Sequence, residues 1–215
     1  MSAFPKSSSW PQLCGGLAIA IAILVILSYV YESFRPPFFT TTSPDATYTV
    51  NLYGQKERPA FLTVEVGAVV LKEGQVFWPY QTLHAGDAMD ISFELGWPNH
   101  RWIGENALQF YREQNYTDSK HEQALILVNT TDKVVRHLRI DCEDKFLVFD
   151  MEPASEIRLK IPPSKGDSQG VSATGKFDDG VTFTKYVEFD VRSVGQPFSY
   201  HVFVTPDGVT INRVF

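Results

Sequence analysis

The chain has 215 residues, of which 44% are hydrophobic and 20% charged, and its net charge is −6 at pH 7. An acidic chain without a basic run lacks the side chains that neutralise phosphates, which excludes nucleic acid as a partner. Its two cysteines, Cys14 and Cys142, provide neither a disulfide framework nor a zinc-type cysteine pair. The length allows one large domain or two small ones.

An uncharged run from Leu13 to Tyr31 is the first predicted element. As a helix it rises about 28 Å, close to the roughly 30 Å hydrocarbon thickness of a bilayer. It is longer than the apolar core of a secretory signal, and no Ala-x-Ala-like cleavage site follows it. Aromatic residues stand at both ends, as at membrane interfaces, namely Trp10, Tyr29, Tyr31 and Phe34. We predict a retained single transmembrane helix over 13–31 that contacts the lipid bilayer.

The orientation of this helix rests on a weak charge bias. Lys6 and Arg35 are the basic residues near its two ends, and the free amino terminus tips the balance toward a cytoplasmic N-terminus. We therefore expect residues 1–12 to form a short cytoplasmic tail and the C-terminal domain to be periplasmic or extracellular. Residues 32–46 are rich in proline and threonine and are predicted to form an extended linker.

From residue 47 onward the pattern is that of consecutive strands. Apolar residues between Leu62 and Leu71 recur at every second position, as in a strand with one buried face. Residues 47–118 are predicted to form an N-terminal β-rich lobe, with strands over 48–53, 62–71, 75–78 and 90–95. The segment 104–114 fits either a short helix or a strand.

Residues 119–215 are predicted to form an antiparallel, immunoglobulin-like β-sandwich. Glu156 to Ile161 alternates charged and apolar residues without exception, and Asp179-Gly180 and Asp207-Gly208 are hairpin turn pairs. About eight strands at the spacing of a sandwich are expected here. The fold prediction is thus an N-terminal transmembrane helix followed by a mostly-β extracytoplasmic domain, with strands over 123–129, 134–141, 145–151, 156–161 and 209–215 among others.

Sequence signatures of catalysis are absent from this chain. It has no Gly-x-Ser-x-Gly turn, and no Walker, dinucleotide-binding or His-Glu-x-x-His pattern. Its five histidines are spread singly, without the spacing of metal ligands. We expect a binding protein that is not an enzyme and needs no cofactor or metal.

A rival interpretation uses His137, Asp141 and Cys142 for metal binding or catalysis. His137, Arg139 and Asp141 share one face of a predicted strand, and Cys142 begins the turn after it. A membrane anchor followed by a β-sandwich with a cysteine near a turn resembles the copper-delivery proteins of oxidase assembly. That family carries a Cys-x-Cys pair, whereas here Cys142 stands alone between two carboxylates, and a copper(I) site needs a second soft ligand.

Three of the four tryptophans gather in two short stretches that also hold other candidates for recognition. Tryptophan, tyrosine and arginine dominate binding hot spots because they combine large area with a polar handle. The predicted partner-binding residues are Trp78, Tyr80, Trp97, His100, Arg101 and Trp102. Two alternatives stay open for the Trp97–Trp102 loop: stacking on a sugar, as in a carbohydrate-binding surface module, or plugging one end of the sandwich.

Two tripeptides starting at Asn115 and Asn129 match the N-glycosylation pattern. They are informative only in a eukaryotic secretory context. Taken together, the sequence predicts a membrane-anchored extracytoplasmic binding or scaffolding protein, an accessory subunit or assembly factor with protein partners in or at the membrane.

Overall fold

The fold is described from a computed structural model, which describes residues 36–54, 63–87, 99–111, 123–161, 168–190 and 199–214, without the side chains of 63–65 and 84–87. The predicted transmembrane helix over 13–31 lies outside these ranges. Within them, the structure contains no helix with the length and apolar character needed to cross a membrane. The chain divides into two compact units, Met1–Pro37 and Phe38–Phe215, and the second holds every strand described below.

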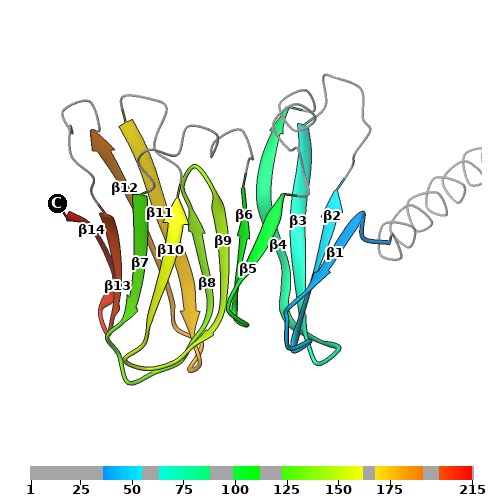
Figure 1. The fold of residues 1–215 in the computed structure, drawn as a ribbon, viewed down its shortest axis with the longest axis horizontal. Coiled ribbons are helices and arrows are strands. Elements are labelled where there is room, and N and C mark those ends of the chain that lie inside the picture. The colour runs from blue at the N-terminus through cyan, green and yellow to red at the C-terminus, as the bar shows by residue number, and fades with distance from the viewer. Residues whose placement is uncertain are drawn as a thin grey trace, which may run out of the picture. The chain divides into compact units, whose positions relative to one another are not determined.

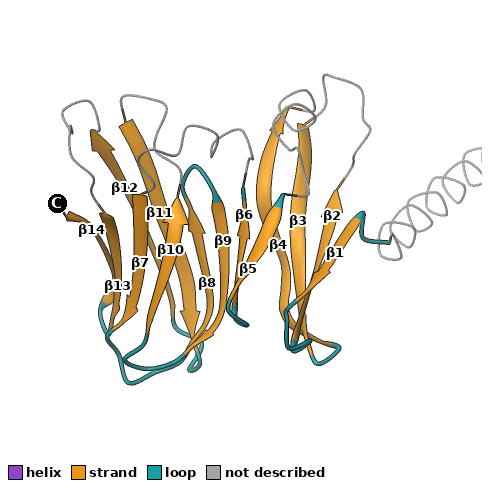
Figure 2. Cartoon of the chain, viewed as in Figure 1, coloured by secondary structure: helices purple, strands orange, loops and turns teal. Residues whose placement is uncertain are grey.

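The described part of the second unit is built from strands without helices (Figure 2). This is consistent with the predicted mostly-β sandwich domain. In chain order the strands are β1 (Phe39–Thr42), β2 (Tyr48–Gly54), β3 (Thr63–Lys72), β4 (Gln75–Asp87), β5 (His100–Ile103), β6 (Ala107–Phe110), β7 (Gln123–Asn129), β8 (Val135–Asp141), β9 (Lys145–Met151), β10 (Glu156–Ile161), β11 (Ser168–Phe177), β12 (Thr182–Asp190), β13 (Ser199–Thr205) and β14 (Gly208–Val214).

These strands form three sheets (Figure 1). Sheet A has the order β1-β2-β3-β4, sheet B the order β12-β11-β8-β9-β6-β5, and sheet C the order β10-β7-β13-β14. The pairings are antiparallel except for β13 with β7, which run parallel. The antiparallel prediction for the second half is therefore incomplete at this one pair, because periodicity within a strand does not determine the direction of its neighbour.

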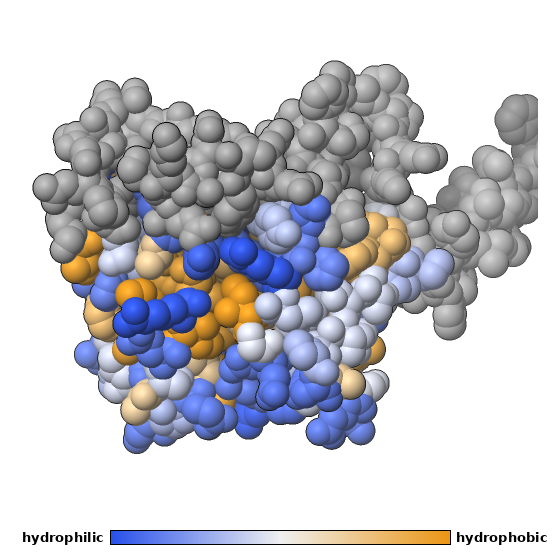
Figure 3. Space-filling view, viewed as in Figure 1, coloured by the Kyte–Doolittle hydropathy of each residue, from blue (hydrophilic) through white to orange (hydrophobic). Residues whose placement is uncertain are grey.

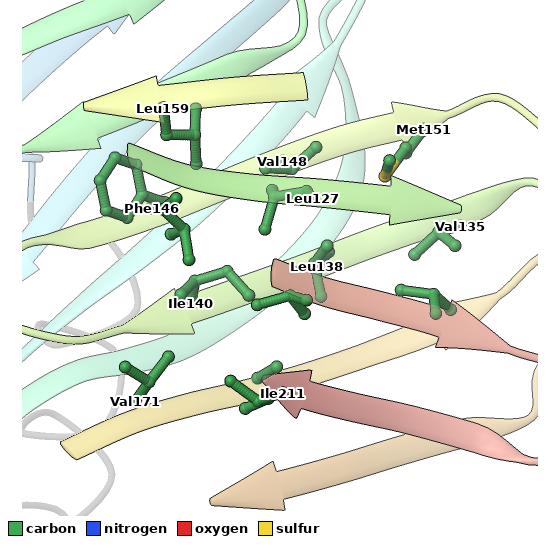
Figure 4. Close-up of a cluster of buried hydrophobic side chains, with 14 of the residues drawn as sticks. Leu127, Val135, Leu138, Ile140, Phe146, Val148, Met151, Leu159, Val171 and Ile211 are labelled. Atoms are coloured by element: carbon green, nitrogen blue, oxygen red, sulfur yellow. The ribbon is translucent and has the colours of Figure 1, made fainter. Parts of the chain in front are cut away.

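Two apolar cores lie on opposite faces of sheet B. On β9, Phe146 and Val148 belong to the core shared with sheet C, while Leu147 and Phe149 belong to the core shared with sheet A. Alternation along the strand thus places a buried residue on each side, as expected where both faces of a sheet are covered. Figure 4 shows the larger core, with Leu127, Val135, Leu138, Ile140, Phe146, Val148, Met151, Leu159, Val171 and Ile211 labelled.

Turn residues with positive φ set the register of the hairpins. Glu73 and Gly74, between β3 and β4, have φ of 51° and 80°, the pattern of a two-residue hairpin turn. Gly180 and Gly208 have φ of 91° and 133°. The expected turns at Lys72–Gly74 and at the two Asp-Gly pairs are confirmed.

Strand pairing crosses the boundary expected at residue 118. β6, from the predicted 47–118 lobe, pairs along its whole length with β9, from the predicted 119–215 sandwich. The predicted linker over 32–46 also differs in part: Phe39–Thr42 forms β1, which pairs with β2 from Phe39↔Leu52 to Thr42↔Thr49. Three consecutive threonines favour an extended backbone, and the neighbouring edge of β2 supplies the hydrogen bonds.

Candidate functional site

Three of the predicted partner-binding residues lie between sheets A and B. Trp78 is 6% exposed and belongs to the core between these sheets, and Trp102 packs against the same core. The indole Nε1 of Trp102 donates to the hydroxyl of Thr41 at 3.0 Å, and Nε2 of His100 lies 3.0 Å from that same oxygen. These contacts join β5 to β1. His100 and Trp102 therefore lie in a strand, whereas the sequence predicted a loop.

Arg101 points to the opposite side of β5. Its Nε donates to Oε1 of Gln109 at 2.6 Å, and its guanidinium lies 5.4 Å from the ring centre of Tyr111. Gln109 is fully buried, and its Nε2 donates to Oδ2 of Asp144 at 2.5 Å and to the Lys160 carbonyl at 3.1 Å. Arg101 thus belongs to a largely buried hydrogen-bond network that connects β5 and β6 with β10.

Tyr80 is the most exposed of the predicted site residues in the described part of the chain. It is 46% exposed. Its ring occupies the space over Gly67 where a Cβ would otherwise stand. Trp97, the remaining predicted residue, lies outside the described ranges. The structure therefore does not gather the predicted residues into one patch: His100 and Trp102 share a contact, while Arg101 and Tyr80 face elsewhere.

In the rival constellation, sheet B separates Cys142 from His137 and Asp141, which share one face of β8. His137 stacks on Trp78, with ring centroids 4.8 Å apart, and its Nε2 lies 3.1 Å from the Phe77 carbonyl oxygen. Burial lowers the pKa of His137 below the ordinary 6.5, although the Phe77 carbonyl opposes this shift. His137 is thus a neutral contact between sheets at pH 7.

Asp141 and Cys142 have structural partners of their own. The Asp141 carboxylate forms ion pairs with Arg139 at 2.7 Å and Lys145 at 3.1 Å. The Cys142 thiol donates to the Asp144 carbonyl at 3.4 Å and packs against the core on the other side of the sheet from His137. Burial raises the pKa of this thiol, so it stays protonated at neutral pH. Across the described part of the chain, no three His, Cys, Asp or Glu side chains lie together as a metal site would require.

A charged cluster joins sheets A and B near the end of β9. The Asp150 carboxylate accepts hydrogen bonds from Tyr48 at 2.8 Å, Lys72 at 2.5 Å and Arg136 at 3.0 Å. Burial alone would raise the pKa of Asp150, but the bonds from Lys72 and Tyr48 outweigh it and lower the pKa below 3.8. Asp150 has φ of 46°, which a non-glycine residue rarely adopts. The cluster holds the sheets together through one carboxylate.

The tripeptide at Asn129 that matches the N-glycosylation pattern has its asparagine side chain hydrogen-bonded inside the fold. Asn129 is fully buried, and its Nδ2 donates to the carbonyls of Lys133, Met151 and Glu152 at 2.8, 3.2 and 3.0 Å. A glycan on this nitrogen is incompatible with the folded state. The sequon at Asn115 lies outside the described residues.

Sequence reasoning missed the outward face of sheet C. On its two central strands, Ile126, Val128 and Phe203 alternate with the core residues Leu125, Leu127, Val202 and Val204. The strands pair in register, with Val128 beside Phe203 and Ile126 beside His201. Figure 3 shows apolar residues among polar ones in the region where β7, β10 and β13 lie in Figure 1. The sequence did carry a signal for this surface. A strand that is apolar on both faces can direct only one face into the core, so its other apolar side chains must lie on the outer face of the sheet.

Comparisons with known proteins give little further guidance. No protein-family model matches the chain, and no curated protein matches its sequence. Among solved structures, it is similar to a protein from Eubacterium rectale determined by NMR, with 18% identity and a TM-score of 0.32, over 45% of this chain and 91% of that chain. A likeness of this size supports no conclusion about function.

Proposed function

We propose that this protein is a membrane-anchored extracytoplasmic binding or scaffolding protein that acts as an accessory subunit or assembly factor of a larger membrane complex. Two features support the proposal. The uncharged run from Leu13 to Tyr31 would anchor the chain in the membrane, and the outer faces of an immunoglobulin-like sandwich would contact the partners. A cytoplasmic N-terminus places those faces in the periplasm or outside the cell.

The outward face of sheet C is the observation that supports a protein partner. Two rows of side chains cross the sheet: Arg158, Ile126, His201 and Asn212 form one, and Glu156, Val128, Phe203 and Thr210 form the other. The central strands contribute Ile126, Val128 and Phe203 together with His201, while charged and polar residues occupy the edge strands β10 and β14. An apolar centre within a polar rim is the usual anatomy of a protein interface.

The partner is expected to contact the centre of these rows. Phe203 and Val128 are half-buried in the isolated chain, so a partner that covers them removes apolar area from water without having to unfold the sheet. On the rim, Arg158 is paired with Glu156 at 2.7 Å. Rim charges of this kind favour correct register more than they add affinity.

The test is copurification of the full-length protein from mild detergent after crosslinking, with partners identified by mass spectrometry. We expect a stoichiometric integral membrane protein in the wild-type sample, and its loss with Phe203→Asp. Val181→Asp is the matched control, because Val181 is an exposed apolar residue at a hairpin turn, 55% exposed and remote from these rows in sequence. Retention of the partner by Phe203→Asp, or no stoichiometric partner at all, contradicts the proposal.

A further inference from the structure

The chain contains two Asp-Gly pairs, Asp179-Gly180 and Asp207-Gly208, and each begins the same tetrapeptide, Asp-Gly-Val-Thr. The first lies in the turn between β11 and β12, and the second lies in the turn between β13 and β14. Both aspartates are exposed. Because the residues that follow them are identical, a difference in the reactivity of the two aspartates must come mainly from the structure around each turn.

An aspartate followed by glycine can rearrange without an oxidant, a reductant or an enzyme. The glycine nitrogen attacks Cγ of the aspartate, and a C–N bond forms while a carboxyl C–O bond breaks. The proton of the nitrogen and the hydroxyl leave as water, and a succinimide ring remains. Water then opens the ring at the backbone carbonyl to give isoaspartate, whose main chain runs through the side-chain carboxyl and is longer by one methylene. Glycine favours the reaction because it has no side chain to block the approach.

Two conditions control the rate of this rearrangement in a folded protein. The carboxyl group must be able to take up a proton, because a neutral acid releases water far more readily than a carboxylate does. The glycine nitrogen must also be free to leave its hydrogen-bond acceptor and approach Cγ. A turn that holds either group in place therefore slows the reaction.

The turn at Asp179 holds both groups. Lys133 Nζ donates to Oδ2 of Asp179 at 2.7 Å, and the Val181 nitrogen donates to Oδ1 at 3.0 Å. The bond from Lys133, and then that from Val181, lower the pKa of Asp179 below 3.8, so its carboxylate persists at mildly acidic pH. The Gly180 nitrogen donates to the Phe177 carbonyl at 3.1 Å, and the Phe177 nitrogen donates to the Val181 carbonyl at 2.9 Å. Asp179 is therefore protected on both counts.

The turn at Asp207 holds the same groups less firmly. In the ranges that the structure describes, no hydrogen bond or ion pair engages the Asp207 carboxylate. Gly208 is paired with Thr205, and this pair is the last of the β13–β14 ladder. Pairs at the end of a ladder open locally at little cost, and opening this one releases the Gly208 nitrogen. Pro206, which precedes Asp207, has no N–H with which to close the turn.

We propose that Asp207 converts spontaneously to isoaspartate in the folded protein, while Asp179 is protected by its turn. The extra methylene enters the main chain where β14 begins. Among the described strands β14 is an edge strand of sheet C, and it places Ile211 in the core. We therefore expect the modification to weaken the attachment of β14 and to lower the urea midpoint of the protein. This inference does not depend on the proposed scaffolding function.

The experiment is incubation of the full-length protein in a mild detergent for several weeks at physiological temperature and mildly acidic pH. Isoaspartate is located by fragmentation of the digested peptides, and its total is measured by methylation with an isoaspartyl carboxyl methyltransferase. We expect isoaspartate to accumulate several times faster at Asp207 than at Asp179. In denaturant, where neither turn exists, the two positions should react at similar rates. The proposal is overturned if Asp207 stays unmodified in the folded protein, or if both aspartates react there at equal rates.

Two variants separate the turns from each other. Lys133→Ala removes the ion pair to Asp179, so it should speed the modification of Asp179 and leave that of Asp207 unchanged. Asp207→Glu keeps the charge but would have to form a six-membered ring, which closes far more slowly. Its urea midpoint should therefore stay constant during the incubation, while that of the wild type falls. If Lys133→Ala melts like the wild type and Asp179 is no more reactive in it, the protection assigned to the ion pair is wrong.

Discussion

The imidazole of His137 lies flat against the indole of Trp78, with centroids 4.8 Å apart and planes 9° apart. This stack joins the central strand β8 of sheet B to the edge strand β4 of sheet A. Beside it, Arg139 donates to the carbonyls of Thr82 and Leu83 on that same edge. Side chains of sheet B therefore bond to backbone carbonyls of β4, which is an edge strand of sheet A among the described strands.

Because this stack buries His137, stability is expected to fall on mild acidification. The folded pKa of His137 is lower than the ordinary 6.5, so the unfolded chain binds the proton more readily. The contribution is fully present above about pH 6.5 and is lost as the pH falls through the lowered folded pKa. Urea unfolding of the wild type at a series of pH values should show this decline.

The control for that series is His137→Asn, which cannot titrate. We expect the variant to be less stable at neutral pH, because it loses the stack on Trp78, but to show a flatter pH dependence over the same range. An equally steep decline in the variant would assign the effect to other groups.

Asp150 is expected to contribute more to stability than the exposed acidic residues. Asp150→Ala removes three charge-assisted hydrogen bonds and leaves the Tyr48 hydroxyl without an acceptor, a cost of about 2 kcal/mol after allowance for the solvent around Lys72 and Arg136. Asp179→Ala, which breaks an exposed pair with Lys133, should leave the unfolding free energy nearly unchanged.

Asp150→Gly separates the backbone contribution from the side-chain contribution. Glycine accepts the φ of 46° without strain, so this variant should be more stable than Asp150→Ala while still below the wild type. Equal stability of the two variants would mean that the backbone conformation costs nothing. The measurement is the urea midpoint of each.

Strand positions followed from the sequence wherever alternation was strong. The ranges 123–129, 145–151 and 156–161 match β7, β9 and β10 to the residue. β4 extends to Asp87, well past the predicted 78, because Pro79 interrupts the pattern and the pairing with β3 shifts register beside it. The pairing of the strands could not be predicted, because it depends on long-range packing. The local alternation of apolar residues carries no information about which strands become neighbours.

The site residues were harder to predict for a related reason. Trp78, His100 and Trp102 have the composition of a binding surface, and aromatic residues are equally suited to a core. In a sandwich of only two sheets, one face of sheet B would be exposed to solvent, and these residues could contact a partner there. In this protein sheet A covers that face. The sequence pattern of the strands does not indicate how many sheets are stacked.

Trp102 and Arg101 are expected to act through folding. Trp102→Ala should lower the free energy of unfolding by about 2–3 kcal/mol, because the ring packs on the core and its nitrogen bonds to Thr41. Arg101→Ala removes the hydrogen bond from the guanidinium to the buried Oε1 of Gln109. We expect this to lower the free energy of unfolding by about 1–2 kcal/mol. Variants that melt like the wild type but no longer retain a copurifying partner would instead support direct recognition.

Cys142 is expected to be unreactive in the folded protein. Its raised pKa leaves little thiolate at neutral pH, and the thiolate is the form that alkylating reagents attack. In a Cys14→Ser background, iodoacetamide should modify Cys142 far faster in denaturant than in buffer. Cys142→Ser should leave the metal content of the purified protein unchanged. Stoichiometric copper or zinc that disappears with this substitution would support metal delivery instead.

The predicted topology is tested by a cysteine introduced at Ser168, an exposed residue at the first position of β11. In a chain with both native cysteines replaced by serine, a membrane-impermeant maleimide should label Ser168→Cys in intact cells or spheroplasts. Ser7→Cys, in the predicted cytoplasmic tail, should be labelled only after lysis. The reverse pattern would place the sheets in the cytoplasm, and labelling of both positions without lysis would mean that the run from Leu13 to Tyr31 does not cross the membrane. In either case the proposed role beside an extracytoplasmic membrane complex fails, whereas partner binding through sheet C is tested separately by the copurification above.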